Sequence, residues 1–259
     1  MADYGHDPTE TAVPFETFLD AGYDITFATE TGTSPRCDQR MLEGWTQKLL
    51  GAKASTIAAY NAMLTHPSLL QPLGWTEPSF SLEPYNLVFL PGGHDSGVRQ
   101  VIDSEVVHKH IVSYFPHCLK SAANAKAIAA VCHGVMVLSE SSYPAEYPDA
   151  EKAGKSVAYD LATTALPHTF EQGIWHATRP VLGDYYKTYG AGSPSVEQAV
   201  KAKLRDPKTQ WKGGIDPLCA NIVEDDAYNY ISARFPGDVP EMVKAVLKMM
   251  DRVLEEKAT

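Results

Sequence analysis

The amino-acid sequence predicts an α/β fold built around a mostly parallel β-sheet. Two short apolar runs, 87–90 and 127–131, contain no charged residue, which is typical of strands buried on both faces of a parallel sheet. Segments with the periodicity of amphipathic helices lie between and around these runs. The chain has 259 residues, 44% of them hydrophobic and 21% charged, so it can form one large domain with an ample core.

The first elements are expected to be a helix and then a strand. Pro14 suits the first turn of a helix, because proline has no N–H to leave unpaired there, and Gly22 suits its end. The helix would bury the face that carries Phe15 and Phe18. Residues 23–29 (Tyr-Asp-Ile-Thr-Phe-Ala-Thr) are then predicted to form the first clear strand.

The middle of the chain combines a predicted insertion with the second strand. Residues 33–84 contain two amphipathic stretches, 40–50 and 54–65, and then several prolines, so we interpret them as a helical insertion. The strand 87–90 ends in a Pro-Gly-Gly loop, whose glycines let backbone N–H groups approach a ligand closely. Residues 98–115 are expected to be helical.

The strand 127–131 leads directly into Cys132, His133 and Gly134, after which an apolar run resumes with helical character. A strand, a sharp turn with a nucleophile and a helix make up a nucleophile elbow, here with Cys in place of Ser. The helix N-terminus would favour a thiolate and lower the thiol pKa. A lone cysteine is more often simply buried, but the adjacent imidazole and the glycine favour a nucleophile.

The C-terminal half is predicted to contain a mixture of loops, helices and a hairpin. An aromatic-rich stretch, 172–212, reads as a second insertion. The other expected elements are a polar loop at 139–154, a strand at 155–158, a helix at 193–204, a hairpin of strands at 216–223 and 227–233, and a final helix opened by a capping box at 238–241.

Charge and cysteine usage exclude several classes of function. The formal net charge is −10 with no basic block, which argues against nucleic acid and anionic membranes as partners. No run of 18 apolar residues occurs and the N-terminus is polar, so we expect neither a membrane span nor a signal peptide, and a cytoplasmic location. The four cysteines lack metal or disulfide spacing, and His108 and His110 would point to different helix faces. We therefore expect no metal site.

The elbow and its surroundings resemble the DJ-1/PfpI superfamily, and within it the Hsp31-like branch of glutathione-independent glyoxalases. The resemblance rests on 130–134 (Ala-Val-Cys-His-Gly), on 89–94 (Phe-Leu-Pro-Gly-Gly-His) and on 10–14 (Glu-Thr-Ala-Val-Pro), which is similar to the family's first-helix motif. It implies a flavodoxin-like three-layer α/β/α sandwich. Residues 1–259 would form a single domain of this kind, with helical insertions at about 33–84 and 172–212.

The resemblance also implies roles for individual residues. Cys132 would be the nucleophile, His133 the base or proton shuttle, and Glu10 a general acid/base beside the thiol. Glu171 lies in a segment similar to the one that holds the triad acid, and would accept a hydrogen bond from the imidazole. Backbone N–H groups would form the oxyanion and substrate-binding site at Gly92, Gly93, His133 and Gly134.

The implied reaction is of the glyoxalase III type and needs no redox cofactor or metal. It converts methylglyoxal or a related α-oxoaldehyde to a 2-hydroxy acid such as lactate, without glutathione. The expected partner is thus a small carbonyl substrate, and a homodimer is one expected state. Two alternatives remain: a cysteine hydrolase, hydratase or biosynthetic enzyme with a larger small-molecule substrate, and a redox-sensing or chaperone protein. An amidotransferase-like domain would need a His-x-Glu near the C-terminus, which we do not find.

Three features depart from the family pattern. The first strand ahead of Glu10 is missing or reduced to residues 2–4, so either the sequence is shortened or the sheet is built differently, and neighbouring strands would expose pairing groups. His168 stands where acidic residues are familiar. The second insertion would bring an aromatic lid towards the pocket, suited to a larger substrate and formed by Trp175, His176, Tyr185 and Tyr186.

Overall fold

The centre of the molecule is a four-stranded sheet in the order β5-β6-β8-β7. In the computed structural model, which describes residues 1–258 and the side chains of 1–255, these strands are Leu87–Leu90, Ala127–Val131, Tyr230–Ala233 and Ile222–Glu224. β5, β6 and β8 run parallel, and β7 pairs antiparallel with β8. Every residue of β6 is buried, as its uncharged sequence predicts.

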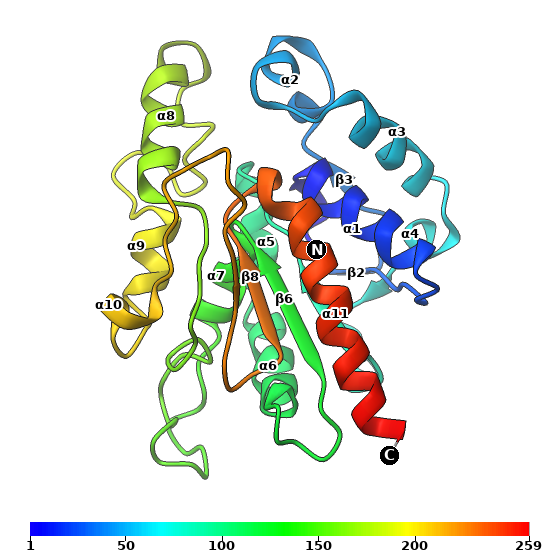
Figure 1. Ribbon diagram of the computed structural model, residues 1–259. Helices are drawn as coiled ribbons and strands as arrows, with labels where there is room; N and C mark the ends of the chain where they lie inside the picture. The colour runs from blue at the N-terminus through cyan, green and yellow to red at the C-terminus, as the bar shows by residue number, and fades with distance from the viewer. Residues whose placement is uncertain (259) are drawn as a thin grey trace.

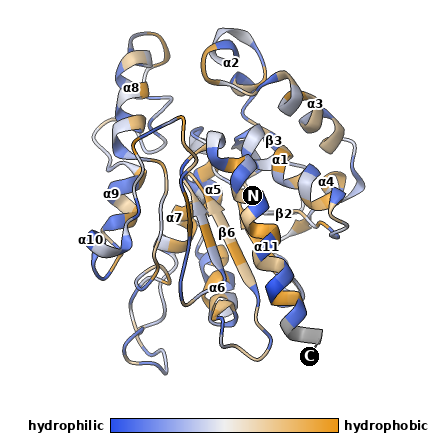
Figure 2. Ribbon diagram, viewed as in Figure 1, coloured by the Kyte–Doolittle hydropathy of each residue, from blue (hydrophilic) through white to orange (hydrophobic). Residues whose placement is uncertain are grey.

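Helices cover both faces of this sheet (Figure 1). On one face α11 (Val239–Ala258) packs against β6 and β8, with α1 (Pro8–Asp20) beside it. On the other face α7 (Gly134–Glu140) packs against β5 and β6 and contacts α5 (Arg99–Ile102) and α6 (Glu105–Tyr114). Figure 2 shows the apolar residues of β6 between the two helical layers. The predicted α/β fold with a mostly parallel sheet is confirmed.

Two further pairs of short strands lie beside the main sheet. β1 (Tyr4–His6) pairs parallel with β3 (Arg36–Cys37), and β2 (Ala28–Thr29) pairs parallel with β4 (Leu73–Gly74). The strand predicted over 23–29 is therefore formed only at its last two residues.

The two predicted insertions supply helices outside the sandwich. Figure 1 shows α2–α4 on one side of the molecule and α8–α10 on the other. The helices α2–α4 are Gly44–Leu50, Ala54–Met63 and Pro67–Leu70, and α8–α10 are His168–Leu182, Val196–Lys201 and Pro207–Gln210. The short 3-10 helices η1–η4 are Gln39–Met41, Ser96–Val98, Phe115–Cys118 and Pro236–Asp238.

The first helix begins earlier than predicted. The Asp7 side chain accepts hydrogen bonds from the N–H groups of Thr9 and Glu10, Pro8 occupies the first turn, and Pro14 lies inside the helix. The prediction that Pro14 opens the helix is wrong because a capping carboxylate followed by proline is the stronger start signal. This start places Glu10 in the first turn.

Two other local predictions are wrong. Residues 155–158 form no strand, only an isolated bridge between Ser142 and Ser156. The Asp238 carboxylate does not serve the final helix as a cap, because it accepts hydrogen bonds from the backbone N–H and the guanidinium of the buried Arg234. A buried guanidinium requires such a partner, and it outcompetes the helix N–H groups.

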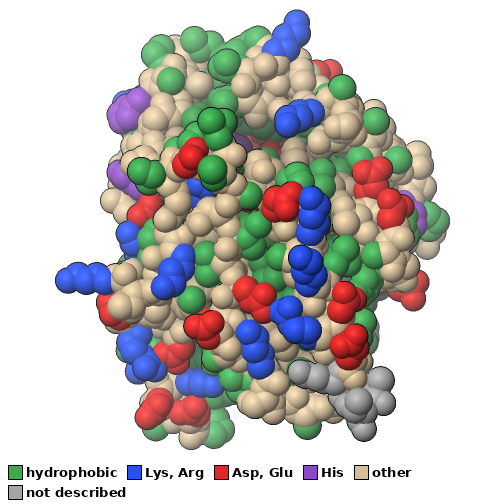
Figure 3. Space-filling view, viewed as in Figure 1, with side chains coloured by type: hydrophobic (Ala, Val, Ile, Leu, Met, Phe, Trp, Pro, Cys, Tyr) green, Lys and Arg blue, Asp and Glu red, His purple; other side chains and the backbone are tan. Residues whose placement is uncertain are grey.

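The surface in the view of Figure 1 carries charges of both signs. Figure 3 shows Lys and Arg side chains interspersed with Asp and Glu on this face. Within residues 1–258, none of the helices combines the length and the apolar character needed to cross a bilayer.

Candidate active site

Cys132 occupies a strained turn between β6 and α7. Its φ is 57°, and it is the one non-glycine residue in 1–258 with a positive φ. A conformation of this kind costs about 1–3 kcal/mol and persists where the surrounding structure imposes it. Here the Cys132 N–H donates to the carbonyl of Ala233, the last residue of β8, at 3.2 Å. The C-terminal end of β8 therefore holds the turn in place. The predicted elbow geometry is present.

Two glycines allow the loop after β5 to pass close to the elbow. A Cβ atom on Gly134 would lie 2.1 Å from the Leu90 carbonyl oxygen, and one on Gly92 would lie 2.7 Å from the His133 nitrogen. Both distances are shorter than any real contact, so these positions require glycine. The sequence predicted that the glycines of this loop let its backbone approach a ligand closely. In the structure Gly92 lets the loop approach the elbow itself.

His133 bridges the thiol and Thr188. Its Nδ1 lies 3.5 Å from Cys132 Sγ, and its Nε2 lies 2.8 Å from Thr188 Oγ1. The Thr188 hydroxyl donates its single proton to the His94 carbonyl at 2.8 Å, so its oxygen accepts from Nε2–H. This fixes the neutral tautomer in which the Nδ1 lone pair faces the thiol.

Glu10 reaches the thiol from the opposite side. Its Oε2 accepts a hydrogen bond from Gly92 N–H at 2.8 Å, and the carboxyl also interacts with the Cys132 thiol. Glu10 is fully buried, and its Oε1 has no hydrogen-bond partner among the described residues. The early start of α1 and the close loop therefore bring the predicted carboxyl, thiol and imidazole together.

Burial shifts the pKa of all three groups in the direction that favours their neutral forms. Burial, followed by the Asp7 charge, raises the pKa of Glu10 well above its ordinary value of 4.5. Burial, followed by the Glu10 charge, raises the pKa of the Cys132 thiol well above 9.0. Burial, then His94 and Lys187, lower the pKa of His133 to about 3. These shifts favour a protonated carboxyl and thiol, and a neutral imidazole whose free nitrogen can accept a proton.

The expected lowering of the thiol pKa is wrong for this closed arrangement. Cys132 is 1% exposed, and α7 is only seven residues long. Loss of hydration penalises the thiolate more than the short helix stabilises it. In this arrangement the thiol form of Cys132 is therefore favoured over the thiolate.

Glu171 does not contact the imidazole. It forms a buried ion pair with Lys187 at 3.1 Å and accepts from Val196 N–H at 2.8 Å. The expectation that Glu171 accepts from His133 is wrong, because Thr188 occupies that position. Lys187 immediately precedes Thr188, so the ion pair holds the segment that positions the imidazole. His168 lies beside Ser195, with Nδ1 3.0 Å from its hydroxyl, and does not replace the acid.

The predicted oxyanion donors are only partly available. Gly92 N–H is engaged by Glu10, so it does not face a substrate in this arrangement. The N–H groups of Gly93 and His133 make no backbone hydrogen bond within residues 1–258. The His133 N–H interacts with the thiol. Gly134 allows the turn to pass close to the Leu90 carbonyl.

Aromatic residues of the second insertion cover the site. The Tyr186 ring lies 4.8 Å from the His94 ring and 4.7 Å from the Tyr185 ring. Tyr185 hydrogen bonds to Asp38 from the first insertion. Trp175 is buried in the same cluster as Tyr186, whereas His176 is exposed. Both tyrosines thus reach the site as expected, and the two insertions meet over it.

Several polar atoms beside the loop of Gly92 to His94 are buried without hydrogen-bond partners in the described chain. They belong to both ring nitrogens of His6, to His94 Nδ1 and to the Tyr186 hydroxyl. Buried polar groups are normally paired, so this cluster is suited to a small polar ligand. No group of three or more His, Cys, Asp or Glu residues within 1–258 is arranged to hold a metal ion.

Comparisons with known proteins agree with this architecture. A family model described as ThiJ/PfpI family-like matches residues 1–215. An uncharacterized protein of Schizosaccharomyces pombe is 26% identical over 255 residues, which cover 98% of this chain and 83% of the relative.

Solved structures show the same fold at low identity. Glyoxalase III from Candida albicans has a TM-score of 0.60 at 17% identity and covers 95% of this chain and 88% of its own. Drosophila melanogaster DJ-1beta has a TM-score of 0.50 at 16% identity, covering 99% of this chain and 96% of its own. Because the family model spans most of the sequence and the fold agrees, the chain belongs to the ThiJ/PfpI-like family of the DJ-1/PfpI superfamily, with its flavodoxin-like fold.

Proposed function

We propose that this protein is a glutathione-independent glyoxalase that converts methylglyoxal or a related α-oxoaldehyde to a 2-hydroxy acid. The observation that carries the proposal is the position of the Cys132 thiol beside the His133 imidazole and the Glu10 carboxyl, whose pKa shifts favour their neutral forms. Addition of a thiol to an aldehyde needs a proton acceptor on sulfur and a proton donor on oxygen. His133 and Glu10 can supply one each.

The first step would form a hemithioacetal. Cys132 sulfur bonds to the aldehyde carbon C1, its proton passes to His133 Nδ1, and the C1 oxygen takes the proton of Glu10. The Glu10 carboxylate then removes the C1 hydrogen as a proton while the imidazolium protonates the C2 oxygen. The product of this step is an enediol still bonded to sulfur.

The second half would return both groups to their starting state. Glu10 gives its proton to C2 while His133 takes the proton of the C1 hydroxyl, which leaves a thioester. Water adds its hydroxyl to C1 and gives its proton to Glu10. The C1–S bond breaks and the sulfur takes the proton of His133. The net change is addition of one water, so no oxidant or reductant is consumed.

Substrate access would require movement of the tyrosines that cover the thiol. Tyr185 and Tyr186 lie on a segment flanked by Gly183 and Gly190, both with positive φ. Glycine adopts such conformations without strain, so these positions can act as hinges. The segment would open for binding and close to exclude water from the enediol.

A larger substrate of the same class is the second candidate, and the aromatic cover favours it. The rings of Tyr185, Tyr186 and His94 contact one another beside the site. Such a wall would stabilise a bulky or aromatic substituent on the oxoaldehyde. A higher kcat/KM for phenylglyoxal than for methylglyoxal would support this candidate, and the reverse order would favour methylglyoxal.

A redox-sensing role has less support. Sensor thiols are exposed and have low pKa values, whereas Cys132 is buried with a raised pKa. Four free cysteines suit a cytosolic setting, where thiols stay reduced.

The proposal is tested by lactate formation from methylglyoxal without glutathione. We expect activity in the wild type and none above background in Cys132→Ala, because the proposed reaction forms its bond to C1 through the Cys132 sulfur. Cys219→Ala is the matched control, since Cys219 is exposed and should have no effect. Full activity in Cys132→Ala with an unchanged circular dichroism spectrum would end the proposal.

A further inference from the structure

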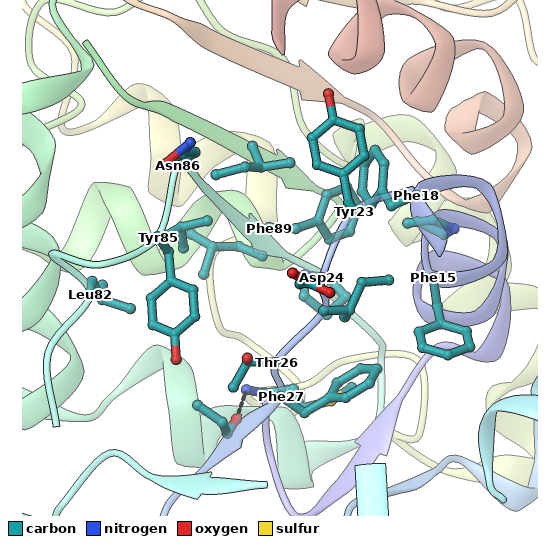
Figure 4. A pocket seen from close by; sticks show the side chains of 18 of the residues that line it. Phe15, Phe18, Tyr23, Asp24, Thr26, Phe27, Leu82, Tyr85, Asn86 and Phe89 are labelled. Atoms are coloured by element: carbon teal, nitrogen blue, oxygen red, sulfur yellow. Dashed lines mark hydrogen bonds between the residues drawn. The ribbon is translucent and has the colours of Figure 1, made fainter. Parts of the chain in front are cut away.

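A large apolar cavity gives no access to the Cys132 thiol. It lies between β5 and the segment that follows α1, has a volume of about 1030 Å³, and includes Tyr23 and Phe89 in its wall (Figure 4). None of Cys132, His133 and Glu10 lines this cavity, and the thiol is 1% exposed. A reactant therefore has to reach the sulfur by another route, past the aromatic residues that cover it.

Tyr185 and Tyr186 are the central residues of a tight turn over the site. The Lys187 N–H donates to the Asp184 carbonyl at 2.7 Å and closes this turn. We call the two residues the tyrosine flap. Side chains at the centre of a turn can swing outward while the chain on either side keeps its place.

The chain that follows the flap is held by buried contacts. Lys187 pairs with Glu171 at 3.1 Å, and these side chains are 2% and 3% exposed. Thr188 contacts His133 Nε2 at 2.8 Å. Breaking these contacts would leave a charge and a ring N–H buried without partners. Opening of the flap alone would leave Thr188 on the imidazole.

Tyr186 does not hold the flap closed by itself. Its side chain is 2% exposed, and its hydroxyl has no hydrogen-bond partner among the described residues. A buried hydroxyl without a partner opposes the closed position, although the ring packs against His94 and Tyr185. Closure then depends on a second contact, which Tyr185 provides.

Tyr185 connects the flap to the first insertion. Its hydroxyl donates a hydrogen bond to the Asp38 carboxylate, and the Arg40 guanidinium lies 4.6 Å from its ring centroid. Asp38 is 2% exposed, and burial raises its pKa to about 6, so at pH 8 the hydrogen bond is charge-assisted and little screened. Asp38 is itself fixed, because its N–H donates to the His6 carbonyl at 3.0 Å.

A second tyrosine makes the same kind of contact in a different setting. The Tyr189 hydroxyl donates to Asp103, and the Arg99 guanidinium lies 4.8 Å from the Tyr189 ring centroid. The Asp103 side chain is 45% exposed, so water and salt weaken this contact. Tyr189 also follows Thr188, beyond the part of the chain that the buried contacts hold.

We propose that Asp38 and Arg40 latch the tyrosine flap through Tyr185, and that release of this latch controls access to Cys132. The inference rests on the proposed function, because access matters when the thiol has to meet a substrate. It gives the first insertion a role in the reaction. It also allows the site to open while Thr188 keeps the imidazole in position.

The test is the rate at which iodoacetamide alkylates Cys132 in the folded full chain at pH 8, mapped by peptide mass spectrometry. Tyr185→Phe keeps the ring and removes the hydroxyl, so we expect this rate to rise by about tenfold or more. Tyr189→Phe is the matched control and should change the rate by less than about twofold. Asp38→Asn should give the same rise as Tyr185→Phe, and the double variant should give no further rise.

Two other cysteines serve as references in the same samples. Cys219 is exposed and should react at one rate in every variant. Cys118 is 0% exposed in the main core, so its alkylation reports unfolding of the chain and should stay slow.

Three results would overturn the proposal. They are an unchanged Cys132 rate in Tyr185→Phe, an equal rise in Tyr189→Phe, and a parallel rise at Cys118, which would make unfolding the cause. Alkylation needs no turnover, so failure here is distinguishable from failure of the proposed function, which lactate formation reports.

Discussion

The Cys132 side chain is held by contacts with residues far away in the sequence. The elbow itself is contiguous, and the residues from Ala130 to Gly134 were sufficient to predict it. The carboxyl and the hydroxyl that complete the site come from Glu10 and Thr188. Glu10 lies beside the thiol, and Thr188 orients the imidazole so that its Nδ1 faces the sulfur.

Thr188 positions the imidazole, so its hydroxyl should matter for turnover. Thr188→Val keeps the shape but leaves the buried Nε2–H of His133 and the His94 carbonyl without partners. We expect kcat to fall by about tenfold or more and stability to fall by about 1–3 kcal/mol. Thr188→Ser, which keeps the hydroxyl, should retain most activity. Unchanged kcat in the Val variant would contradict this role.

Sequence analysis identified Cys132, His133 and Glu10 because their motifs are local. It did not identify Thr188, whose contact with His133 spans 55 residues and depends on how a loop folds. It also misjudged the thiol pKa, because burial is decided by packing of distant segments. The Asp7-Pro8 start was readable in the sequence, since aspartate before proline is a helix-start signal.

At the scale of elements, a buried ion pair ties α8 to the loop over the site. Glu171 lies on α8 and Lys187 on the loop, and both side chains are almost completely buried. Removing one partner leaves the other charge buried without compensation. The pair therefore holds the loop that carries Tyr185, Tyr186 and Thr188.

Glu171→Gln separates a structural role from a catalytic one. We expect a loss of about 3–5 kcal/mol in the free energy of unfolding, measured by urea denaturation. Glu146→Gln, at an exposed position, is the control and should change stability little. A variant with wild-type stability but greatly reduced kcat would restore Glu171 as a direct partner in catalysis.

Strand predictions succeeded where the run pairs with a neighbour along its whole length, as 87–90 does with β6. The run 127–131 is flanked by β5 and β8 and formed as expected. Residues 24–27 pair with no strand in the described chain, so most of the run 23–29 forms no ladder. Hydrophobic periodicity indicates which side chains become buried, whereas strand pairing depends on which segment lies beside the run. The assignment of residues 1–259 to one domain stays a prediction.

At the scale of the whole molecule, the buried acid should make stability depend on pH. Unfolded Glu10 loses its proton above its ordinary pKa of 4.5, whereas folded Glu10 keeps it because burial raises the pKa. Folding then takes up a proton, so stability falls as pH rises above 4.5, by up to about 1.4 kcal/mol per pH unit until the folded pKa is reached.

Glu10→Gln removes this titration. As the pH rises above 5 the wild type should lose stability relative to the variant, by roughly 1 kcal/mol per pH unit until the folded pKa is reached, in urea denaturation at each pH. Glu16→Gln, exposed on the same helix, should follow the wild type. Parallel curves for the wild type and Glu10→Gln would show that the carboxyl is already ionised in the folded protein.

The most direct measurement of the central claim is peptide mass spectrometry after brief exposure of Glu10→Gln to methylglyoxal without glutathione. Without the carboxyl, proton transfer between C1 and C2 and thioester hydrolysis should both slow by about 100-fold or more, so an adduct should accumulate. We predict that it maps to the peptide carrying Cys132 and is absent from the Glu10→Gln/Cys132→Ala double variant. Lactate formation by the wild type with no adduct on Cys132, or with adducts only on other residues, would contradict the account.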